Sequence, residues 1–357
     1  MQVLITGGAG FLGSHVADEL VAAGHGVRAL DSLVDQVHED GGRPAYLAPE
    51  VELCVGDVRD AEAVGSALDG CDAVVHFAAR VGVGQSMYEV AEYTSVNDFG
   101  TAVLLEALAS RPVARLVVAS SMSVYGEGLY EGGAEVARSR EQLERGAWEP
   151  GPKPLPTPET KPVALASIYA LTKYQQERAC LIAGEAYGIP AVPLRFFNVY
   201  GPRQALSNPY TGVLAIFASR LLNGKPPLIY EDGLQRRDFV SVHDVARATR
   251  LALETGGADG QVVNVGSGVS VTVRELAEKL AAVLGVEIEP ETTGDYRVGD
   301  IRHCFADISR ARALLGYKPQ VALEDGMAEL AEWLSTQTAV DRVEAAQDEL
   351  ARRGLRF

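Results

Sequence analysis

A glycine-rich turn next to the N-terminus constrains the fold of this chain more than any other feature. Residues 2–6 (QVLIT) are a short apolar run, and residues 14–23 (SHVADELVAA) carry apolar side chains at helical spacing. Glycines between them allow a tight turn, a close approach of backbone to a pyrophosphate, and close packing of the helix on the strand. The first turn of the helix also offers N–H groups to phosphates. The pattern therefore predicts a dinucleotide site on Gly7, Gly10, Phe11, Leu12 and Gly13.

An acidic residue at the end of the next apolar run indicates which dinucleotide this is. Residues 26–30 lead into Asp31, which stands 24 positions after Gly7. A carboxylate there can bond the ribose 2′-hydroxyl and would repel a 2′-phosphate, so NAD is favoured over NADP. A helix-capping aspartate is the alternative interpretation. Two more strand ends, at Asp57 and Val58 and at residues 74–79, are expected to line the same site.

Composition limits the class of partner. The chain has 357 residues, 47% of them hydrophobic, which is enough for a large core and about two domains. Its net charge of −16 argues against nucleic acid or an anionic membrane surface as partner and favours a small-molecule ligand. The four cysteines have no CxxC spacing, no metal site is predicted, and nothing before the first strand reads as a signal peptide or membrane span. We therefore expect a soluble cytoplasmic enzyme with reduced thiols.

Apolar strands and helical stretches alternate to about residue 190, which predicts an α/β fold with a doubly wound parallel sheet and helices on both faces. Residues 127–162 interrupt the alternation, because they are rich in Glu, Arg and Gly and then in Pro. A stretch this long without periodicity is either a functional lid or a surface arm. We predict a dinucleotide-binding domain over 1–195, a smaller mixed α/β substrate domain over 196–340 with some segments returning to the first sheet, and a C-terminal helical tail over 341–357.

A tyrosine and a lysine four residues apart supply the chemistry. Tyr169 would lose its proton only near pH 10 unless a cation stood close to it, and Lys173 lies on the same face of a helix. Lys173 could also hold the ribose hydroxyls next to the nicotinamide. Residues 115–126 form a strand that ends in serines, and a serine hydroxyl there can bond the substrate oxygen while Tyr169 takes the proton. An exposed tyrosine beside a solvated lysine is the alternative interpretation.

Together these motifs resemble those of the extended short-chain dehydrogenases/reductases, in the NAD-dependent epimerase/dehydratase family, over nearly the whole chain. The resemblance implies Ser121, Tyr169 and Lys173 as catalytic residues and NAD as cofactor. It implies cofactor contacts by Phe77, Ala78 and Ala79, structural support of the site by Asn97, and binding of the nucleotide diphosphate by Asn198, Arg237 and Arg302. For each arginine a surface salt bridge remains the alternative. The remaining substrate-binding residues that it implies are Gly84, Gln85, Ser86, Met122 and Ser123.

Two absent acids narrow the reaction that the resemblance implies. Family dehydratases carry an Asp-Glu pair directly after the catalytic Ser/Thr, and the decarboxylases carry a Glu at the position of Ser123, whereas this chain has Met122 and Ser123. Inversion of a secondary alcohol needs neither acid, because hydride abstraction, proton transfer and a bound keto intermediate suffice. We therefore expect a nucleotide-sugar 4-epimerase, with a 4-keto-sugar reductase as the alternative. Decarboxylation of UDP-glucuronate, 4,6-dehydration and a non-catalytic NAD-binding regulator are less favoured.

Two sequence segments, residues 83–88 and 121–128, resemble those of family members that act on dTDP-linked 6-deoxyhexoses, and so does the long arm. UDP-hexose and UDP-glucuronate remain open as substrates because their 4-epimerases share the same core residues. The arm either shapes the sugar pocket or serves as surface decoration or a dimer contact. Helices between residues 85 and 110 and near 170–187 resemble those that pair in family dimers, so a homodimer is expected.

Overall fold

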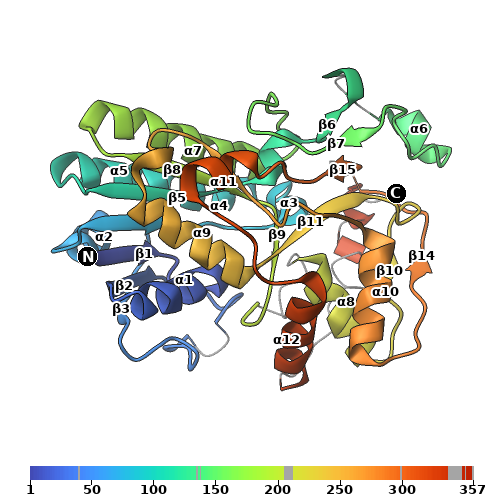
Figure 1. Ribbon diagram of the computed structural model, residues 1–357, viewed down its shortest axis with the longest axis horizontal. Coiled ribbons are helices and arrows are strands. Elements are labelled where there is room, and N and C mark those ends of the chain that lie inside the picture. The colour runs from blue at the N-terminus through green and yellow to red at the C-terminus, as the bar shows by residue number, and fades with distance from the viewer. Residues whose placement is uncertain are drawn as a thin grey trace.

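The computed structural model describes residues 1–38, 41–133, 136, 138–204, 212–297, 300–336, 348–349 and 351–355. Its centre is a seven-stranded parallel sheet in the order β12-β8-β5-β4-β1-β2-β3 (Figure 1). The strands of this sheet are β1 (Gln2–Thr6), β2 (Gly26–Asp31), β3 (Glu52–Val55), β4 (Ala73–His76), β5 (Arg115–Ser121), β8 (Ala191–Phe196) and β12 (Val263–Val265). The predicted doubly wound parallel sheet is confirmed.

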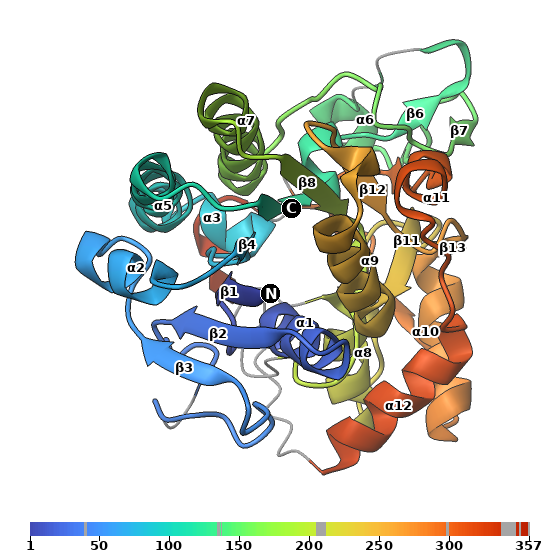
Figure 2. The same cartoon turned by 60° about the vertical axis from the view of Figure 1, so that its left-hand side comes forward.

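Helices cover both faces of the sheet because the short strands alternate their buried side chains between two apolar cores. Val3 and Ile5 of β1 belong to the core under α1 (Phe11–Ala22) and α9 (Val242–Glu254), whereas Leu4 faces the opposite core. Figure 2 shows the two layers of helices on either side of the strands. The second layer consists of α2 (Ala61–Leu68), α5 (Gly100–Ser110) and α7 (Ile168–Tyr187).

A second unit with its own apolar core lies beyond the carboxyl end of the sheet. Four strands, β9 (Asn198–Tyr200), β11 (Arg236–Ser241), β13 (Ser270–Thr272) and β15 (His303–Cys304), pair around β11. The pair β10 (Leu228–Ile229) and β14 (Glu291–Thr292) adds to it. Its helices are α8 (Val213–Leu222), α10 (Val273–Leu284) and α12 (Leu323–Ser335), and they share one buried cluster. β12, α9 and α11 (Ser309–Leu315) follow β9 in the chain and yet pack with the main sheet.

The arm at residues 127–162 is a hairpin with one short helix. β6 (Leu129–Tyr130) pairs antiparallel with β7 (Pro154–Leu155), and α6 (Arg140–Glu144) lies between them in the chain. Figure 1 shows the hairpin and α6 at the edge of the molecule beside β15. The foot of the arm is fixed by backbone bonds to the segment after β15: Thr157 N donates to Phe305 O at 2.8 Å, and Asp307 N donates to Thr157 O at 3.0 Å.

Short helices complete the described structure. They are α3 (Val83–Ser86), α4 (Val90–Tyr93), a π-helical turn at Thr94–Phe99 and 3-10 turns at Met122–Tyr125, Glu131–Gly133 and Gly256–Ala258. The predicted C-terminal tail at 341–357 lies mostly outside the described residues. Within the described part of the chain, no helix has the length and apolar character needed to cross a membrane.

Candidate active site

One cavity of about 700 Å³ runs from the glycine turn across the carboxyl ends of β1, β2, β4 and β5 to the second unit. This is the edge at which ligands bind in open parallel sheets. Twelve of the residues that the motifs and the resemblance imply for the cofactor line this cavity, and Asn97 and Lys173 do not. The twelve are Gly7, Gly10, Phe11, Leu12, Gly13, Asp31, Asp57, Val58, Phe77, Ala78, Ala79 and Tyr169, which is implied for catalysis as well.

The glycine turn fits a dinucleotide because side chains are sterically excluded from it. A Cβ on Gly13 would lie 2.1 Å from Gly7 O, and one on Gly7 would lie 2.8 Å from Ala78 N, at a φ of +70°. The neighbouring strands and the first turn of α1 therefore approach each other through bare backbone. Gly10 differs, since its Cβ would meet nothing closer than 3.5 Å. Its missing side chain leaves room on the cavity side.

Asp31 orders the loops at the carboxyl end of β2. Its carboxylate accepts hydrogen bonds from Ala9 N and Leu33 N, each at 3.0 Å, so it orders the glycine turn and its own loop. The same residue lines the cavity, where it can also accept from ribose hydroxyls. No helix begins in residues 32–38, so the helix-capping alternative does not describe Asp31, and contact with the cofactor stays a prediction.

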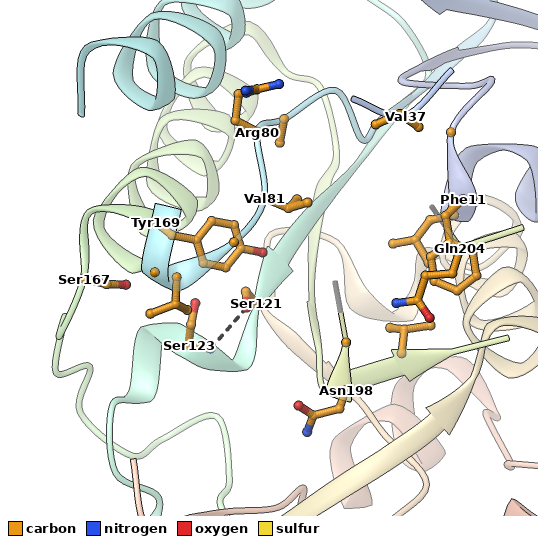
Figure 3. Close-up of a pocket in the computed structure, with 18 of the residues that line it drawn as sticks. Phe11, Val37, Arg80, Val81, Ser121, Ser123, Ser167, Tyr169, Asn198 and Gln204 are labelled. Atoms are coloured by element: carbon orange, nitrogen blue, oxygen red, sulfur yellow. Dashed lines mark hydrogen bonds between the residues drawn. The ribbon is translucent and has the colours of Figure 1, made fainter. Parts of the chain in front are cut away.

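Ser121 and Tyr169 meet in the middle of the cavity although they come from different elements. Ser121 ends β5, where its Oγ accepts from Ser123 N at 3.2 Å, and Tyr169 is the second residue of α7. Figure 3 shows the Tyr169 hydroxyl directed toward Ser121, with Val81 beside the ring. Burial raises the pKa of Tyr169, while its hydrogen bond with Ser121 lowers it. The pair has the geometry of an acid–base group and a hydroxyl that share one substrate oxygen.

Lys173 lies behind Tyr169, with its side chain in a buried polar network. Its Nζ donates to Gln176 Oε1 at 2.8 Å, and Gln176 Nε2 donates to Thr101 Oγ1 at 2.9 Å. Burial lowers the pKa of Lys173 to about 8, so the ammonium form still predominates at neutral pH. His76 in this network is neutral, because burial lowers its pKa to about 3. Lys173 is therefore a buried cation one helical turn after Tyr169, and its side chain bonds Gln176 and does not line the cavity.

Asn97 connects the catalytic helix to the loop after β4. Its Oδ1 accepts from Arg80 N at 2.7 Å, and its Nδ2 donates to Arg80 O at 3.1 Å and to Thr172 Oγ1 at 2.9 Å. It stands in the π-helical turn, a feature found often at functional sites. These contacts suit the supporting role that the resemblance implied for Asn97.

The residues predicted for the sugar end divide into two groups. Gly84, Met122 and Ser123 line the cavity, whereas Gln85 and Ser86 are buried beside it. Ser86 Oγ accepts from Tyr169 N at 3.0 Å and so holds the first turn of the catalytic helix. Gln85 Nε2 donates to Glu89 at 3.0 Å. The geometry thus gives Ser86 and Gln85 positions behind the site rather than in contact with a substrate.

Asn198 and Arg237, which the resemblance implied for the nucleotide diphosphate, line the far end of the cavity. Asn198 Nδ2 donates to Asp238 O at 2.9 Å. The Arg237 guanidinium donates to Ile301 O at 2.6 Å and to Arg302 O at 2.9 Å, which fixes its plane at the cavity wall. Burial lowers the pKa of Arg237, as expected of a cation that faces no close carboxylate partner strong enough to offset its desolvation.

Arg302 requires a correction. Its side chain is 0% exposed, does not line the cavity, and is shared by the carboxylates of Glu149, Glu231 and Asp232. A guanidinium surrounded in this way has no free donor directed at a diphosphate. The salt-bridge alternative describes Arg302, although the ion pair is buried rather than at the surface.

Arg297 is an arginine of the cavity wall that the sequence did not predict. It lines the cavity, its guanidinium carbon lies 4.7 Å from the centre of the Tyr230 ring, and its Nε donates to Asp300 at 2.9 Å. Arg297 and Arg302 stand on either side of the same Asp300, five positions apart, so the sequence alone gave no reason to choose between them. Other cavity residues that it missed at this end are Phe217, Tyr230, Glu231 and Gln235.

This chain is similar to proteins of one family over most of its length. The model of the NAD dependent epimerase/dehydratase family matches residues 3–266. A dTDP-L-rhamnose 4-epimerase from Burkholderia thailandensis is 38% identical over 94% of this chain and 95% of the relative. A UDP-glucose 4-epimerase from Thermotoga maritima, solved with UDP-glucose, is 33% identical with a TM-score of 0.80, over 94% of this chain and 99% of the other. A Thermus thermophilus UDP-glucose 4-epimerase, solved with NAD, is 32% identical with a TM-score of 0.78, over 95% and 100%.

The chain therefore belongs to the NAD dependent epimerase/dehydratase family. It is an NAD-dependent epimerase, an isomerase on a Rossmann sheet.

Proposed function

We propose that this protein inverts C4 of a nucleotide-linked sugar through a transient 4-keto intermediate. One observation carries the proposal: Ser121 and Tyr169 lie in a single cavity between the dinucleotide turn and the arginines Arg237 and Arg297. A nucleotide sugar anchored by its diphosphate at those arginines would present its sugar to Tyr169. Met122 and Ser123 next to the pair supply neither the acid nor the base that an elimination would need.

Each residue has a defined part in this reaction. NAD, when bound, supplies the acceptor and then the donor of the C4 hydride. Tyr169 removes the proton of the 4-hydroxyl and later returns it, while Ser121 donates a hydrogen bond to the same oxygen. In this proposal the positive charge of Lys173, one turn further along α7, stabilises the Tyr169 phenolate. Burial acts in the opposite direction and raises the pKa of Tyr169. Arg237 and Arg297 retain the diphosphate while the sugar turns its other face, so few polar groups are needed around the sugar.

We place a dTDP-linked 6-deoxyhexose first among the substrates, ahead of a UDP-hexose or UDP-glucuronate. Val81, Val83, Met87 and Met122 line the cavity, and Val81 lies beside the Tyr169 ring in Figure 3. An apolar wall here suits the methyl group of a 6-deoxy sugar better than a hydroxymethyl or a carboxylate, because burying a polar group without a partner costs free energy. The similarity to the Burkholderia thailandensis relative points the same way.

The decisive experiment uses purified protein without added cofactor in D2O, with dTDP-L-rhamnose, UDP-glucose and UDP-glucuronate, followed by proton NMR. Inversion at C4 without incorporation of deuterium would support hydride return within one active site. Turnover that begins only after NAD(P)H and a 4-keto sugar are supplied would contradict the proposal and favour a ketoreductase. The Tyr169→Phe variant is the matched blank for every substrate.

We also propose a homodimer that forms through α5 and α7. Phe99, just before α5, and Ile182 on α7 are 56% and 60% exposed, and Leu171 on α7 is exposed as well. Large apolar side chains on adjacent helices are typical of an interface. Light scattering on Ile182→Glu should give half the mass of the parent protein, and an unchanged mass would contradict this interface.

A cytoplasmic location is part of the proposal, since all four cysteines are free.

A further inference from the structure

Arg302, which has no free donor for a substrate, joins the arm to the wall of the active site. From the arm, Glu149 Oε1 accepts from Arg302 Nε at 3.0 Å and from its Nη2 at 2.5 Å. From the cavity side, Glu231 accepts from Arg302 Nη1 at 2.9 Å, and Asp232 accepts at 2.7 Å and 2.9 Å. One buried guanidinium thus fixes two segments that lie about 80 residues apart in the chain.

A second arginine of the arm reaches the same carboxylate. Arg138 Nη1 donates to Glu231 Oε1 at 2.6 Å, and its Nη2 donates to Asp300 O at 3.0 Å. Glu231 is only 3% exposed, lines the cavity, and has a φ of +55°, a conformation that a non-glycine residue keeps only when its surroundings hold it. The two guanidinium groups supply that hold and neutralise a carboxylate that would otherwise repel a diphosphate.

The backbone behind Arg237 is also held by the arm. Arg302 N donates to Glu127 Oε1 at 2.6 Å, and His303 N donates to Glu127 Oε2 at 3.1 Å. On its other side this backbone presents the carbonyl oxygens of Ile301 and Arg302 to the Arg237 guanidinium. The orientation of Arg237 therefore depends on a backbone segment clamped between the cavity wall and the arm.

The arm also contacts Tyr296, the residue next to Arg297 in the chain. The centre of the Trp148 ring lies 6.3 Å from the centre of the Tyr296 ring, and Tyr296 directly precedes Arg297 in the chain. The arm thus touches the supports of both Arg237 and Arg297. None of its described residues between 127 and 162 lines the cavity itself.

We propose that the arm is a positioning element for the nucleotide-diphosphate end of the active site, acting through Arg138 and Glu149 on Glu231, Arg302 and the backbone that orients Arg237. This inference rests on the proposed function, because it concerns the substrate's diphosphate. It differs from a lid over the sugar, which would have to touch the residues around Tyr169. The arm acts on binding of the substrate and leaves the proton transfer at Tyr169 unaffected.

The test compares Arg138→Gln and Glu149→Gln with Glu141→Gln, a change of the same kind at an exposed position on the same arm. Isothermal titration with dTDP and with UDP gives the affinity for the nucleoside diphosphate without turnover, at a temperature where every variant is fully folded. We expect a Kd about tenfold weaker in the first two variants and unchanged in Glu141→Gln. In turnover, KM should rise by a similar factor with kcat within about twofold and NAD content unchanged. Arg138→Lys should recover part of the affinity, because it restores the charge next to Glu231.

The outcomes separate the two proposals. If the parent protein binds neither nucleoside diphosphate, the proposed function fails and this inference fails with it. If the parent binds and the Arg138 and Glu149 variants bind equally well, or lose kcat at unchanged affinity, only the role of the arm is overturned. A fall in melting temperature at unchanged affinity would likewise reduce the arm to a stabilising element.

Discussion

The two ends of the cavity are built in opposite ways. At the cofactor end, neighbouring strands of one parallel ladder bring the glycine turn, Asp31 and Ala78 together, and the contacts are mostly through backbone. At the substrate end, residues near 138, 149, 231, 237 and 302 converge from separate segments, and charged side chains make the contacts. The first end needs glycines at fixed spacing, whereas the second needs each guanidinium to be assigned to the right carboxylate.

This difference shows why one type of residue can have opposite roles within one site. The chain has 48 acidic and 32 basic residues, so an arginine meets protein carboxylates more readily than ligand phosphates. Arg302 is neutralised by three of them. Arg237 is held by carbonyl oxygens, which fix its orientation and leave its net charge available to an anion. The immediate partners therefore decide whether an arginine binds substrate or stabilises the fold.

The largest effect is expected where the two ends meet. Tyr169→Phe removes the proton-transferring hydroxyl and leaves the ring in place, so turnover should fall by about 10²–10⁴-fold. NMR assays of C4 inversion measure the loss. Bound NAD and the melting temperature should stay close to those of the parent, which shows that neither end has moved. Turnover at the parent rate would remove Tyr169 from the mechanism.

Arg302→Met and Arg297→Met sharpen the contrast at the substrate end. Removal of Arg302 breaks a buried ion-pair network and leaves Arg138 as the remaining partner of the buried Glu231, so the free energy of unfolding should fall by about 3 kcal/mol. Arg297 is partly exposed and pairs with Asp300, so its loss should cost less than about 1 kcal/mol of stability while weakening nucleoside-diphosphate binding. Urea unfolding and titration calorimetry measure the two quantities. The reverse pattern would show that Arg302 is the ligand-binding arginine after all.

Gly13→Ala and Gly10→Ala test the cofactor end in the same manner. The Gly13 Cβ would collide with Gly7 O, so this variant should lose about 1–3 kcal/mol of stability or more. The Gly10 Cβ has space in the cofactor-free protein and points to where the dinucleotide would lie, so the loss should appear in NAD affinity instead. Unfolding without cofactor and NAD titration distinguish them. If Gly10→Ala lost as much stability as Gly13→Ala, the difference in packing between the two glycines would be contradicted.

The last prediction concerns the charge of Lys173, whose effect appears only as pH changes. Its pKa is about 8 in the folded protein and near 10.5 when unfolded, so between these values the unfolded chain binds more protons. The contribution of Lys173 to stability should therefore rise with pH over that interval, by about 2 kcal/mol between pH 7 and 9.5. Urea unfolding of the cofactor-free parent and of Lys173→Met at both pH values isolates this group. A difference between the two proteins that is independent of pH would contradict the shifted pKa.

Several features of this protein could be predicted from the sequence because they depend on local pattern. The glycine turn, the helix near 14–23, the strand at 26–30 and the parallel sheet follow from spacing and apolar periodicity, which act over a few residues. The Tyr169–Lys173 pair follows from helical geometry in the same way. The family resemblance named NAD, and comparison bore it out.

Tertiary structure decided what depended on partners distant in the chain. The sequence cannot show that Arg302 meets Glu149 and Glu231 while Arg297 faces the cavity, because that depends on how separate segments pack. For the same reason only the fold revealed that Ser86 supports the catalytic helix and that Lys173 lies against Gln176. Local pattern determines which elements form. Long-range packing determines which charges are neutralised within the protein and which remain for a ligand, because the energy of a buried charge depends on its nearest partners.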